Sequence, residues 1–188
     1  MKDTAIVFAR APRLGSVKRR LARGIGDRAA LRFHQATLGR LLRALARDRR
    51  FRTVLAVTGG CVRWPGRLPR IAQGGGDIGQ RMGRACAAFP RGRVAIVGSD
   101  IPDAAPRDLA AAFAALGRAQ AVFGPALDGG YWLVAMGPRR PARPFAGVRW
   151  SGPHALADTR RNFAGRPTSL LRELRDIDTL EDFQAWRG

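Results

Sequence analysis

Acidic side chains are scarce in this sequence, so the few that follow apolar runs are the first candidates for chemistry. The chain holds 14 Asp and Glu residues against 34 Lys and Arg residues. Asp100 closely follows the apolar run 94–98, where a carboxylate can hold Mg²⁺ or Mn²⁺ together with phosphate oxygens. A helix cap is the alternative role in this loop, and Asp103 fits it better because Pro106 opens the next helix. We therefore predict that Asp100 is a metal ligand.

The segment 128–132, Asp-Gly-Gly-Tyr-Trp, places a carboxylate and two aromatic rings around a pair of glycines. Glycine lets the backbone approach a ligand closely, so Asp128 can reach into a site just before the apolar run 133–136. A hairpin turn formed by Asp-Gly is the competing interpretation. We favour a role in ligand binding for this segment.

Two further carboxylates, Asp176 and Asp178, alternate near the C-terminus. An extended backbone puts both on one face, from which they can share a metal ion. Asp178 or Thr179 could equally cap the last helix, whose first turn would hold two more acidic residues. Asp176 is therefore favoured over Asp178 as a ligand.

Basic residues follow the first apolar run, in the segment 10–21. Pro12 and Gly15 shape a turn in this segment. The turn leads into three cations, Lys18, Arg19 and Arg20. Backbone amides and cationic side chains in such a loop can surround a diphosphate. The loop lacks the pattern of a Walker A motif, and an ordinary basic loop explains it about equally well.

The run 74–79 fits the GxGxxG pattern of dinucleotide-binding loops, and Asp100 lies about 20 residues farther on. The preceding segment decides against that function. Residues 68–73 contain a proline and one β-branched residue, whereas a dinucleotide-binding loop should follow a strongly apolar strand. An enzyme that binds NAD or NADP therefore stays a lower alternative.

The hydrophobic pattern indicates the elements that position these loops. Short apolar runs typical of buried strands cover residues 4–9, 53–58, 94–98, 121–123 and 131–136. Helical patterns cover 27–47, 78–89 and 106–116. Asp27 can cap the first helix, in which His34 is expected to be a structural imidazole. Strand and helix alternate, which predicts an α/β three-layer sandwich with a mainly parallel central sheet. Ligands of such sheets bind beyond the carboxyl ends of the strands.

Length and composition narrow the function classes. A chain of 188 residues, 46% of them hydrophobic, is most economically one domain, 1–188. No stretch approaches the roughly 20 apolar residues that span a bilayer, and the N-terminus lacks a signal-peptide pattern, so a cytoplasmic location is expected. Cys61 and Cys86 have no CxxC spacing and no His cluster, so neither a disulfide framework nor a zinc site is predicted.

The net charge of +20 predicts attraction to polyanions. Only two of the 34 basic residues are lysines, and the arginines are scattered along the chain, which indicates a codon bias rather than a nucleic-acid surface. No basic stripe interleaved with stacking aromatics is visible. A nucleic-acid-binding protein is therefore a lower alternative, and no specific nucleic acid is expected as a partner.

Six ordered motifs over residues 4–183 resemble a known family: FARxPxxGxVKxRL, QGxxDIGxRM, GSDxPD, GPxxDGGYWL, FxGVxWS and DIDTxxDF. They are similar to the DUF2064-type transferases of GT-A fold, also named for neighbouring radical SAM and selenodomain proteins. More distantly, they are similar to the molybdenum-cofactor and phospholactate guanylyltransferases.

This resemblance implies a GT-A-type fold with a nucleotide-diphosphate site. It implies donor contacts at Gly15, Lys18, Arg20, Gln73 and Asp77. It implies Mg²⁺ or Mn²⁺ bound by Asp100, Asp176 and Asp178. It implies catalytic or acceptor-side roles for Asp128, Asp176 and Ser151, beside Trp150.

We therefore expect a metal-dependent transferase that uses a nucleotide-activated donor and a small-molecule acceptor. Glycosyl transfer from a nucleotide sugar is the preferred reaction. Guanylyl transfer to a phosphorylated small molecule is the alternative, because GT-A-type sites perform both. Either reaction needs cations that neutralise the donor phosphates and stabilise the leaving group. A homodimer is compatible with the sequence.

Overall fold

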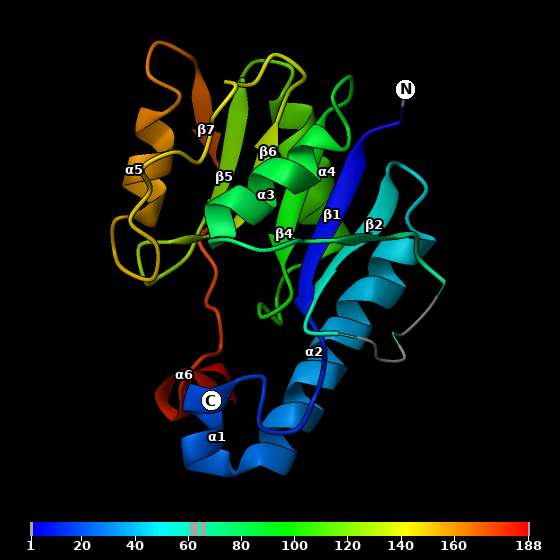
Figure 1. The fold of residues 1–188 in the computed structure, drawn as a ribbon, viewed down its shortest axis with the longest axis vertical. Helices are drawn as coiled ribbons and strands as arrows, with labels where there is room; N and C mark the ends of the chain where they lie inside the picture. The colour runs from blue at the N-terminus through cyan, green and yellow to red at the C-terminus, as the bar shows by residue number, and fades with distance from the viewer. Residues whose placement is uncertain (1, 61–63, 65–66, 188) are drawn as a thin grey trace.

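The centre of the protein is a mixed β-sheet (Figure 1). The computed structural model describes residues 2–60, 64 and 67–187. Their strands are β1 (Thr4–Arg10), β2 (Arg52–Thr58), β3 (Arg70–Ala72), β4 (Val94–Gly98), β5 (Ala121–Pro125), β6 (Tyr131–Met136) and β7 (Thr168–Leu170). Within the described residues these seven strands form one sheet in the order β3-β2-β1-β4-β6-β5-β7.

The sheet is mainly parallel, as predicted, and β6 is the exception. β1 pairs in parallel with β2 and β4, β2 with β3, and β5 with β7. β6 is antiparallel to both β4 and β5. Consequently β1, β4 and β5 end at the same edge of the sheet, and β6 begins there. β1 is buried from Thr4 to Ala9, as a central strand covered on both faces requires.

Helices cover both faces of this sheet. They are α1 (Arg19–Ile25), α2 (Asp27–Arg47), α3 (Ile78–Ala87), α4 (Pro106–Ala115), α5 (Ala155–Arg161) and α6 (Leu180–Arg187). α2 and α4 pack on one face and α3 and α5 on the other (Figure 1). The buried side chains of α2 recur every three or four residues, so one stripe of the helix faces the sheet: Leu38, Leu41, Leu42 and Leu45.

A third, smaller core joins α1 and α2 to the C-terminal segment, below the edge where β1 and β4 end (Figure 1). Leu21 of α1, Ala30 of α2 and Ile177 are buried together there. The ring of Phe33 packs edge-on against Phe183 of α6, with centroids 5.4 Å apart. This core brings the segment before α6 next to the loop after β1.

All five predicted strands and all three predicted helices match observed elements to within a few residues. α1, α5, β3 and β7 were not predicted: the two helices have seven residues each, too few for a clear helical period, and the two strands are partly exposed and lack an apolar run. The predicted cap at Asp27 is wrong. Gly26, with φ +80°, precedes the helix, and Asp27 lies in the first turn.

The predicted helix cap at Asp103 is also wrong. The residue before α4 is Ala105, and its N–H donates to Oδ2 of Asp108 at 2.8 Å. Asp108 lies three residues into the helix and reaches back to the backbone, so no cap is needed from Asp103.

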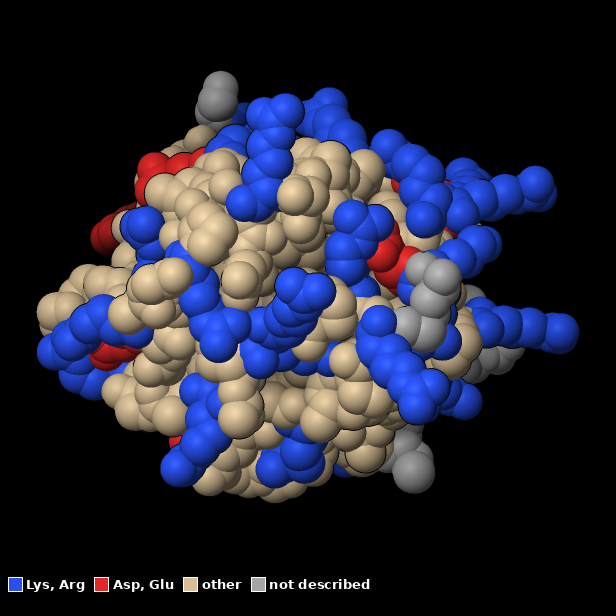
Figure 2. Space-filling model, turned by 90° about the horizontal axis from the view of Figure 1, so that it is seen from above, with Lys and Arg blue, Asp and Glu red and all other residues tan. Residues whose placement is uncertain are grey.

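The remaining expectations concern the cysteines, membrane-spanning segments and the distribution of basic residues. Cys86 is buried in α3, whereas Cys61 lies outside the described residues. None of the helices in the described ranges is long and apolar enough to cross a membrane. Lys and Arg side chains are spread over the end opposite the carboxyl edge (Figure 2), in line with their scatter along the sequence.

Candidate active site

Two adjoining cavities open at the edge where β1, β4 and β5 end. The first has a volume of about 500 Å³ and is lined by the loop after β1 and by the ends of β1 and β4. The second has a volume of about 260 Å³ and is lined by the β5–β6 turn, by β6 and by residues 150–152. Phe8, Ile78, Gly98 and Asp100 contribute to both. We call them the cationic cavity and the apolar cavity, for the side chains that line them.

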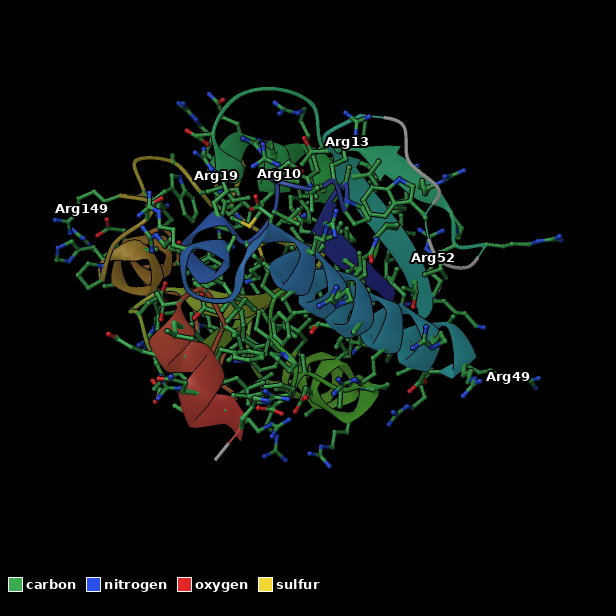
Figure 3. The ribbon with its side chains drawn as sticks, turned by 90° about the horizontal axis from the view of Figure 1, so that it is seen from below. Arg10, Arg13, Arg19, Arg49, Arg52 and Arg149 are labelled. Atoms are coloured by element: carbon green, nitrogen blue, oxygen red, sulfur yellow. The ribbon has the colours of Figure 1, made fainter. Side chains whose placement is uncertain are left out.

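Basic side chains surround the cationic cavity. They are Arg10, Lys18, Arg19, Arg20 and Arg81. Among the described residues, Arg10, Arg19 and Arg20 have no ion-pair partner. Figure 3 views the molecule from this side and shows Arg10 and Arg19 near each other, with Arg49 and Arg149 far from them. Unpaired cations around one hollow make it a site for an anionic group.

Lys18 is the buried cation of this cavity. It has a left-handed backbone, with φ 52°, directly before α1, and its side chain is 2% exposed. Its Nζ lies 2.7 Å from Oδ1 of Asp178 and 3.2 Å from Oδ2 of Asp100. Burial lowers the pKa of Lys18, but the two carboxylates outweigh burial and raise it above its ordinary value. The ammonium is therefore charged and fixed in place.

Asp100 also touches His34 of α2. Nδ1 of His34 lies 3.3 Å from Oδ1 of Asp100, and its Nε2 lies 3.3 Å from the carbonyl oxygen of Arg10. Burial raises the pKa of Asp100, yet Lys18 and His34 lower it to about 2. His34 was expected to be a structural residue, and it is 3% exposed. It also contacts Asp100, a predicted site residue. Its spacing of four residues from Ala30 and Leu38 placed it on the stripe that faces the sheet.

The segment before α6 positions Asp178 beside Lys18. Thr179 forms a reciprocal cap with Asp182: its N–H donates to Oδ2 at 2.9 Å, and its Oγ1 accepts from the N–H of Asp182 at 3.2 Å. Of the two capping alternatives, the structure therefore uses Thr179. Ile177 donates its N–H to the carbonyl oxygen of Asp100 at 3.3 Å, which ties this segment to the end of β4.

Of the residues predicted to contact the donor, three differ in whether they line the cationic cavity. Gln73 lines the cationic cavity, and its buried amide donates to the carbonyl oxygens of Ala9 and Ala56. Asp77 does not line that cavity. It caps α3, with Oδ1 accepting from the N–H of Gln80 at 2.8 Å. Gly15, with φ +70°, lies in the exposed turn before Lys18 and also lies outside the lining.

The turn between β5 and β6 has the predicted hairpin form and also borders the apolar cavity. Oδ1 of Asp128 accepts from the N–H of Gly130 at 2.8 Å, so the segment is a hairpin turn, as the alternative interpretation held. Asp128 also lines the apolar cavity, together with Asp176. Burial, followed by the charges of Asp128 and Asp178, raises the pKa of Asp176 to about 6.

Ser151 lies on the rim of the apolar cavity, next to Trp150. Ser151 has φ 63°, a left-handed backbone that is rare for a residue other than glycine. Asp158, which sequence reasoning missed, anchors this loop because its Oδ2 accepts from the backbone N–H of Arg149 at 3.1 Å. The guanidinium of Arg149 donates to both of its carboxylate oxygens. No motif near Asp158 could have indicated this contact, which joins α5 to the loop before it.

The three predicted metal ligands do not form one compact group. Asp100 and Asp178 share the ammonium of Lys18, whereas Asp176 lines the apolar cavity. In the part of the chain that the structure describes, no group of three His, Cys, Asp or Glu side chains is arranged to hold a metal ion. Their chemistry nevertheless suits Mg²⁺ or Mn²⁺, which prefer carboxylate oxygens. A cation beside Asp176 would also offset the repulsion from its neighbouring carboxylates.

Solved structures resemble this fold over almost its whole length. A candidate nucleotide-diphospho-sugar transferase from Desulfovibrio desulfuricans G20 is 28% identical, with a TM-score of 0.87, and the match covers 98% of this chain and 85% of that one. The 4-diphosphocytidyl-2C-methyl-D-erythritol synthase from Anaerococcus prevotii DSM 20548 is 11% identical, with a TM-score of 0.63 and coverages of 98% and 95%. Rv0371c from Mycobacterium tuberculosis H37Rv, in complex with manganese, is 16% identical, with a TM-score of 0.58 and coverages of 98% and 97%.

Sequence comparison gives the family. No curated protein matches the sequence significantly. The structural neighbours confirm the predicted fold of the nucleotide-diphospho-sugar transferases and the predicted enzyme class, a transferase. Residues 30–152 match the family described as "Uncharacterized protein conserved in bacteria (DUF2064)", and the chain belongs to this family, as its motifs predicted.

Proposed function

We propose that this protein transfers a group from a nucleotide-activated donor in the cationic cavity to a small-molecule acceptor in the apolar cavity. The observation that carries the proposal is the gathering of basic side chains, three without an ion-pair partner among the described residues, directly beside a second cavity. Glycosyl transfer from a nucleotide sugar is the first candidate, supported by the neighbour that is 28% identical. Nucleotidyl transfer is the second, supported by the cytidylyltransferase neighbours.

The cationic side chains act on the donor phosphates. Arg10, Arg19 and Arg20 can turn toward a diphosphate, whereas Lys18 is held by Asp100 and Asp178. A charge fixed before the reaction stabilises the leaving group without the cost of reorganisation. Gln73 can offer its amide oxygen to the nucleotide, because its amide nitrogen is already occupied.

A divalent cation belongs to this proposal. Asp100, Asp176 and Asp178 are the residues that would hold Mg²⁺ or Mn²⁺. When bound, the ion adds positive charge beside the donor diphosphate. The manganese complex of a structural neighbour supports this choice of metal.

The acceptor side is assigned to Asp128, Asp176 and Ser151. All three line the apolar cavity. Asp128, which is not among the residues that would hold the cation, is the carboxylate that can take a proton from an acceptor, with Asp176 beside it. The Ser151 hydroxyl at the rim can donate a hydrogen bond that orients the acceptor.

The test is calorimetric titration of nucleoside triphosphates and nucleotide sugars, with Mn²⁺, at physiological salt. We expect one donor to bind the unmutated protein and Lys18→Ala to weaken binding by about 100-fold, because the fixed positive charge proposed to face the donor phosphates is lost. Arg49→Ala is the matched control: it removes the same charge from an exposed position distant from both cavities (Figure 3) and should leave donor binding unchanged. Failure of every nucleotide to bind would refute the proposal.

The two candidate reactions release different products. Glycosyl transfer from a nucleoside diphosphate sugar leaves a nucleoside diphosphate, whereas nucleotidyl transfer from a triphosphate leaves pyrophosphate. Phosphorus NMR of the reaction mixture distinguishes them directly. Pyrophosphate as the product would replace the first candidate by the second.

A further inference from the structure

The charge of the apolar cavity limits which acceptors can enter it. The charged side chains in its described lining are Asp100, Asp128 and Asp176, and that lining contains no Lys or Arg. This holds in a chain with a net charge of +20. A phosphate or carboxylate group in this cavity would lose water and meet three carboxylates, whose charge a single divalent cation held by Asp100 and Asp176 would offset only in part.

The remaining wall is apolar. Ile78 and Met82 of α3 face the cavity, and the rings of Tyr131 and Trp150 close another side. The Tyr131 hydroxyl lies 3.3 Å from Oγ1 of Thr159, with which it shares a hydrogen bond. The volume of about 260 Å³ lies just below the roughly 300–1,000 Å³ of pockets for drug-sized ligands, so the occupant must be compact.

Trp150 is a preformed part of this wall. Its ring packs against Tyr131 with centroids 6.3 Å apart. The indole fills the space that Gly79 leaves: a Cβ there would lie 2.7 Å from Cζ2 of Trp150 and 3.1 Å from the carbonyl oxygen of Phe145. Gly79 is therefore a positioning residue for the apolar cavity.

From this geometry we infer that the acceptor is a compact molecule without phosphate or carboxylate groups. Its apolar body lies against Trp150, Ile78 and Met82, and its hydroxyl or amino group points toward Asp128. The inference rests on the proposed function and names the substrate class of its second cavity. It goes against the phosphorylated acceptor that guanylyl transfer would require.

The transfer step balances for such an acceptor. The acceptor oxygen or nitrogen forms a bond to the transferred group while the bond from that group to the leaving phosphate oxygen breaks. The acceptor proton passes to the carboxylate of Asp128 and from there to solvent. The phosphate leaves with the bonding electron pair, beside the cations of the neighbouring cavity.

Benzyl alcohol, benzylamine and benzyl phosphate test this inference, because they share one apolar body and differ in charge. Their affinities are measured by ligand-observed NMR titration on the unmutated protein and on Gly79→Ala. We expect Gly79→Ala to weaken the alcohol and the amine by about tenfold or more, because the new methyl group displaces Trp150. Benzyl phosphate should show the same affinity for both proteins, because any binding would be in the cationic cavity.

Two further variants make the result decisive. Gly83→Ala, one turn along α3, adds the same methyl group where nothing lies within 4 Å, and should leave all three affinities unchanged. Trp150→Leu removes the aromatic wall and should also weaken the alcohol and the amine if Gly79→Ala does not fold. Loss of benzyl phosphate binding in either wall variant, or unchanged binding of the alcohol and the amine in both, would overturn the inference.

Donor binding is measured in the same samples, so that the two proposals can fail separately. Nucleotide binding with Mn²⁺ should be unchanged in Gly79→Ala. If no nucleotide binds but the alcohol and the amine depend on Gly79, the proposed donor is refuted and the cavity assignment stands. If a nucleotide binds and benzyl phosphate needs the apolar cavity, the acceptor class is refuted and the transferase proposal stands.

Discussion

The cationic and apolar cavities share Asp100 and one edge of the sheet, yet their charges are opposite. The first is built by parallel strands, by α1 and by the segment before α6, and is lined by five basic residues. The second is built around β6, the antiparallel strand, and its described lining contains carboxylates but no basic residue. The change in strand direction therefore coincides with the change from a lining rich in basic residues to one whose only charged residues, among those described, are carboxylates.

This contrast shows why the net charge alone was a poor guide to function. Arginines cover the end of the molecule opposite the cavities as well (Figure 2). The feature that separates the site from this background is Lys18, whose side chain is 2% exposed between two carboxylates. Burial and fixed partners, rather than the number of charges, mark the cation with a chemical role.

The largest effect is expected from Asp100→Asn, because Asp100 lies at the boundary of the two cavities. The amide keeps the shape but loses the charge that faces Lys18 and His34. Donor binding with Mn²⁺ should fall by about 100-fold, because the variant loses a proposed ligand of the cation and a charge that holds Lys18 in place. Benzyl alcohol binding should change little, since it depends on the apolar wall.

Calorimetry measures the first effect and NMR titration the second, with circular dichroism as the control for folding. Donor binding that matches the unmutated protein would contradict the role of Asp100. Equal losses at both cavities would show that the two act as one site rather than two.

The next effect is expected from Gly24→Ala in α1. A Cβ at this position would lie 2.8 Å from Cβ of Leu180, the first residue of α6. The helix must shift, and with it Asp178, which is held 2.7 Å from Lys18. We expect a loss of about 1–3 kcal/mol of unfolding free energy from overpacking, and roughly tenfold weaker donor binding.

Denaturant unfolding and calorimetry test this prediction, and Gly83→Ala is the control for a glycine-to-alanine change within a helix. Binding of benzyl alcohol should be unchanged, because α6 does not line the apolar cavity. Unchanged donor binding in a destabilised Gly24→Ala protein would show that the position of α6 does not matter for the cationic cavity.

A smaller effect, confined to the apolar side, is expected from Asp158→Asn. Hydrogen bonds from the Arg149 side chain, and then from its backbone, hold the pKa of Asp158 below its ordinary range. A carboxylate with a lowered folded-state pKa adds stability above its unfolded pKa of about 3.9, and this stability is lost as the pH falls toward the folded-state pKa. The variant should melt below the unmutated protein at pH 7, and the difference should shrink below about pH 4.

Thermal melts between pH 3 and pH 7 check this dependence. Asp48→Asn is the control for binding, because Asp48 pairs with Arg50 away from both cavities; its pKa is also lowered, so its melts should show the same pH dependence. Asp158→Asn should also weaken benzyl alcohol binding through the Trp150 loop while leaving donor binding intact. A difference in melting temperature that does not depend on pH would exclude the carboxylate charge as its cause.

Local patterns predicted most of the sheet and the basic loop but not the contacts between them. The run 4–9 and the stripe of leucines in α2 indicated their elements because burial repeats along each element. The pairing of Lys18 with Asp178 spans 160 residues and depends on α6 folding back onto α1. A single sequence carries no local signal for such a contact.

The candidate site was predicted in part for the same reason. Asp100 and Asp128 could be found because each lies at a strand end. Alternation predicted that Asp176 and Asp178 share one face and a metal ion, but Asp178 lines the cationic cavity and Asp176 the apolar cavity, on either side of buried Ile177. His34 was placed in the core correctly, and its contact with Asp100 followed only from the fold.

The smallest effect is expected from Asp103→Asn. This substitution tests whether Asp100 and Asp103, which lie in the same loop, differ in their effect on donor binding. Asp103 lines neither cavity, and the contact of its carboxylate is a long one, in which Oδ1 accepts from Nε1 of Trp186 at 3.4 Å. Asparagine keeps an oxygen acceptor at this position, and such a surface change is usually worth less than about 0.5 kcal/mol. Donor and benzyl alcohol affinities should both match those of the unmutated protein in the titrations used for Asp100→Asn. A clear loss of donor binding in Asp103→Asn would show that the charge of the whole loop, rather than the position of Asp100 beside Lys18, holds the donor.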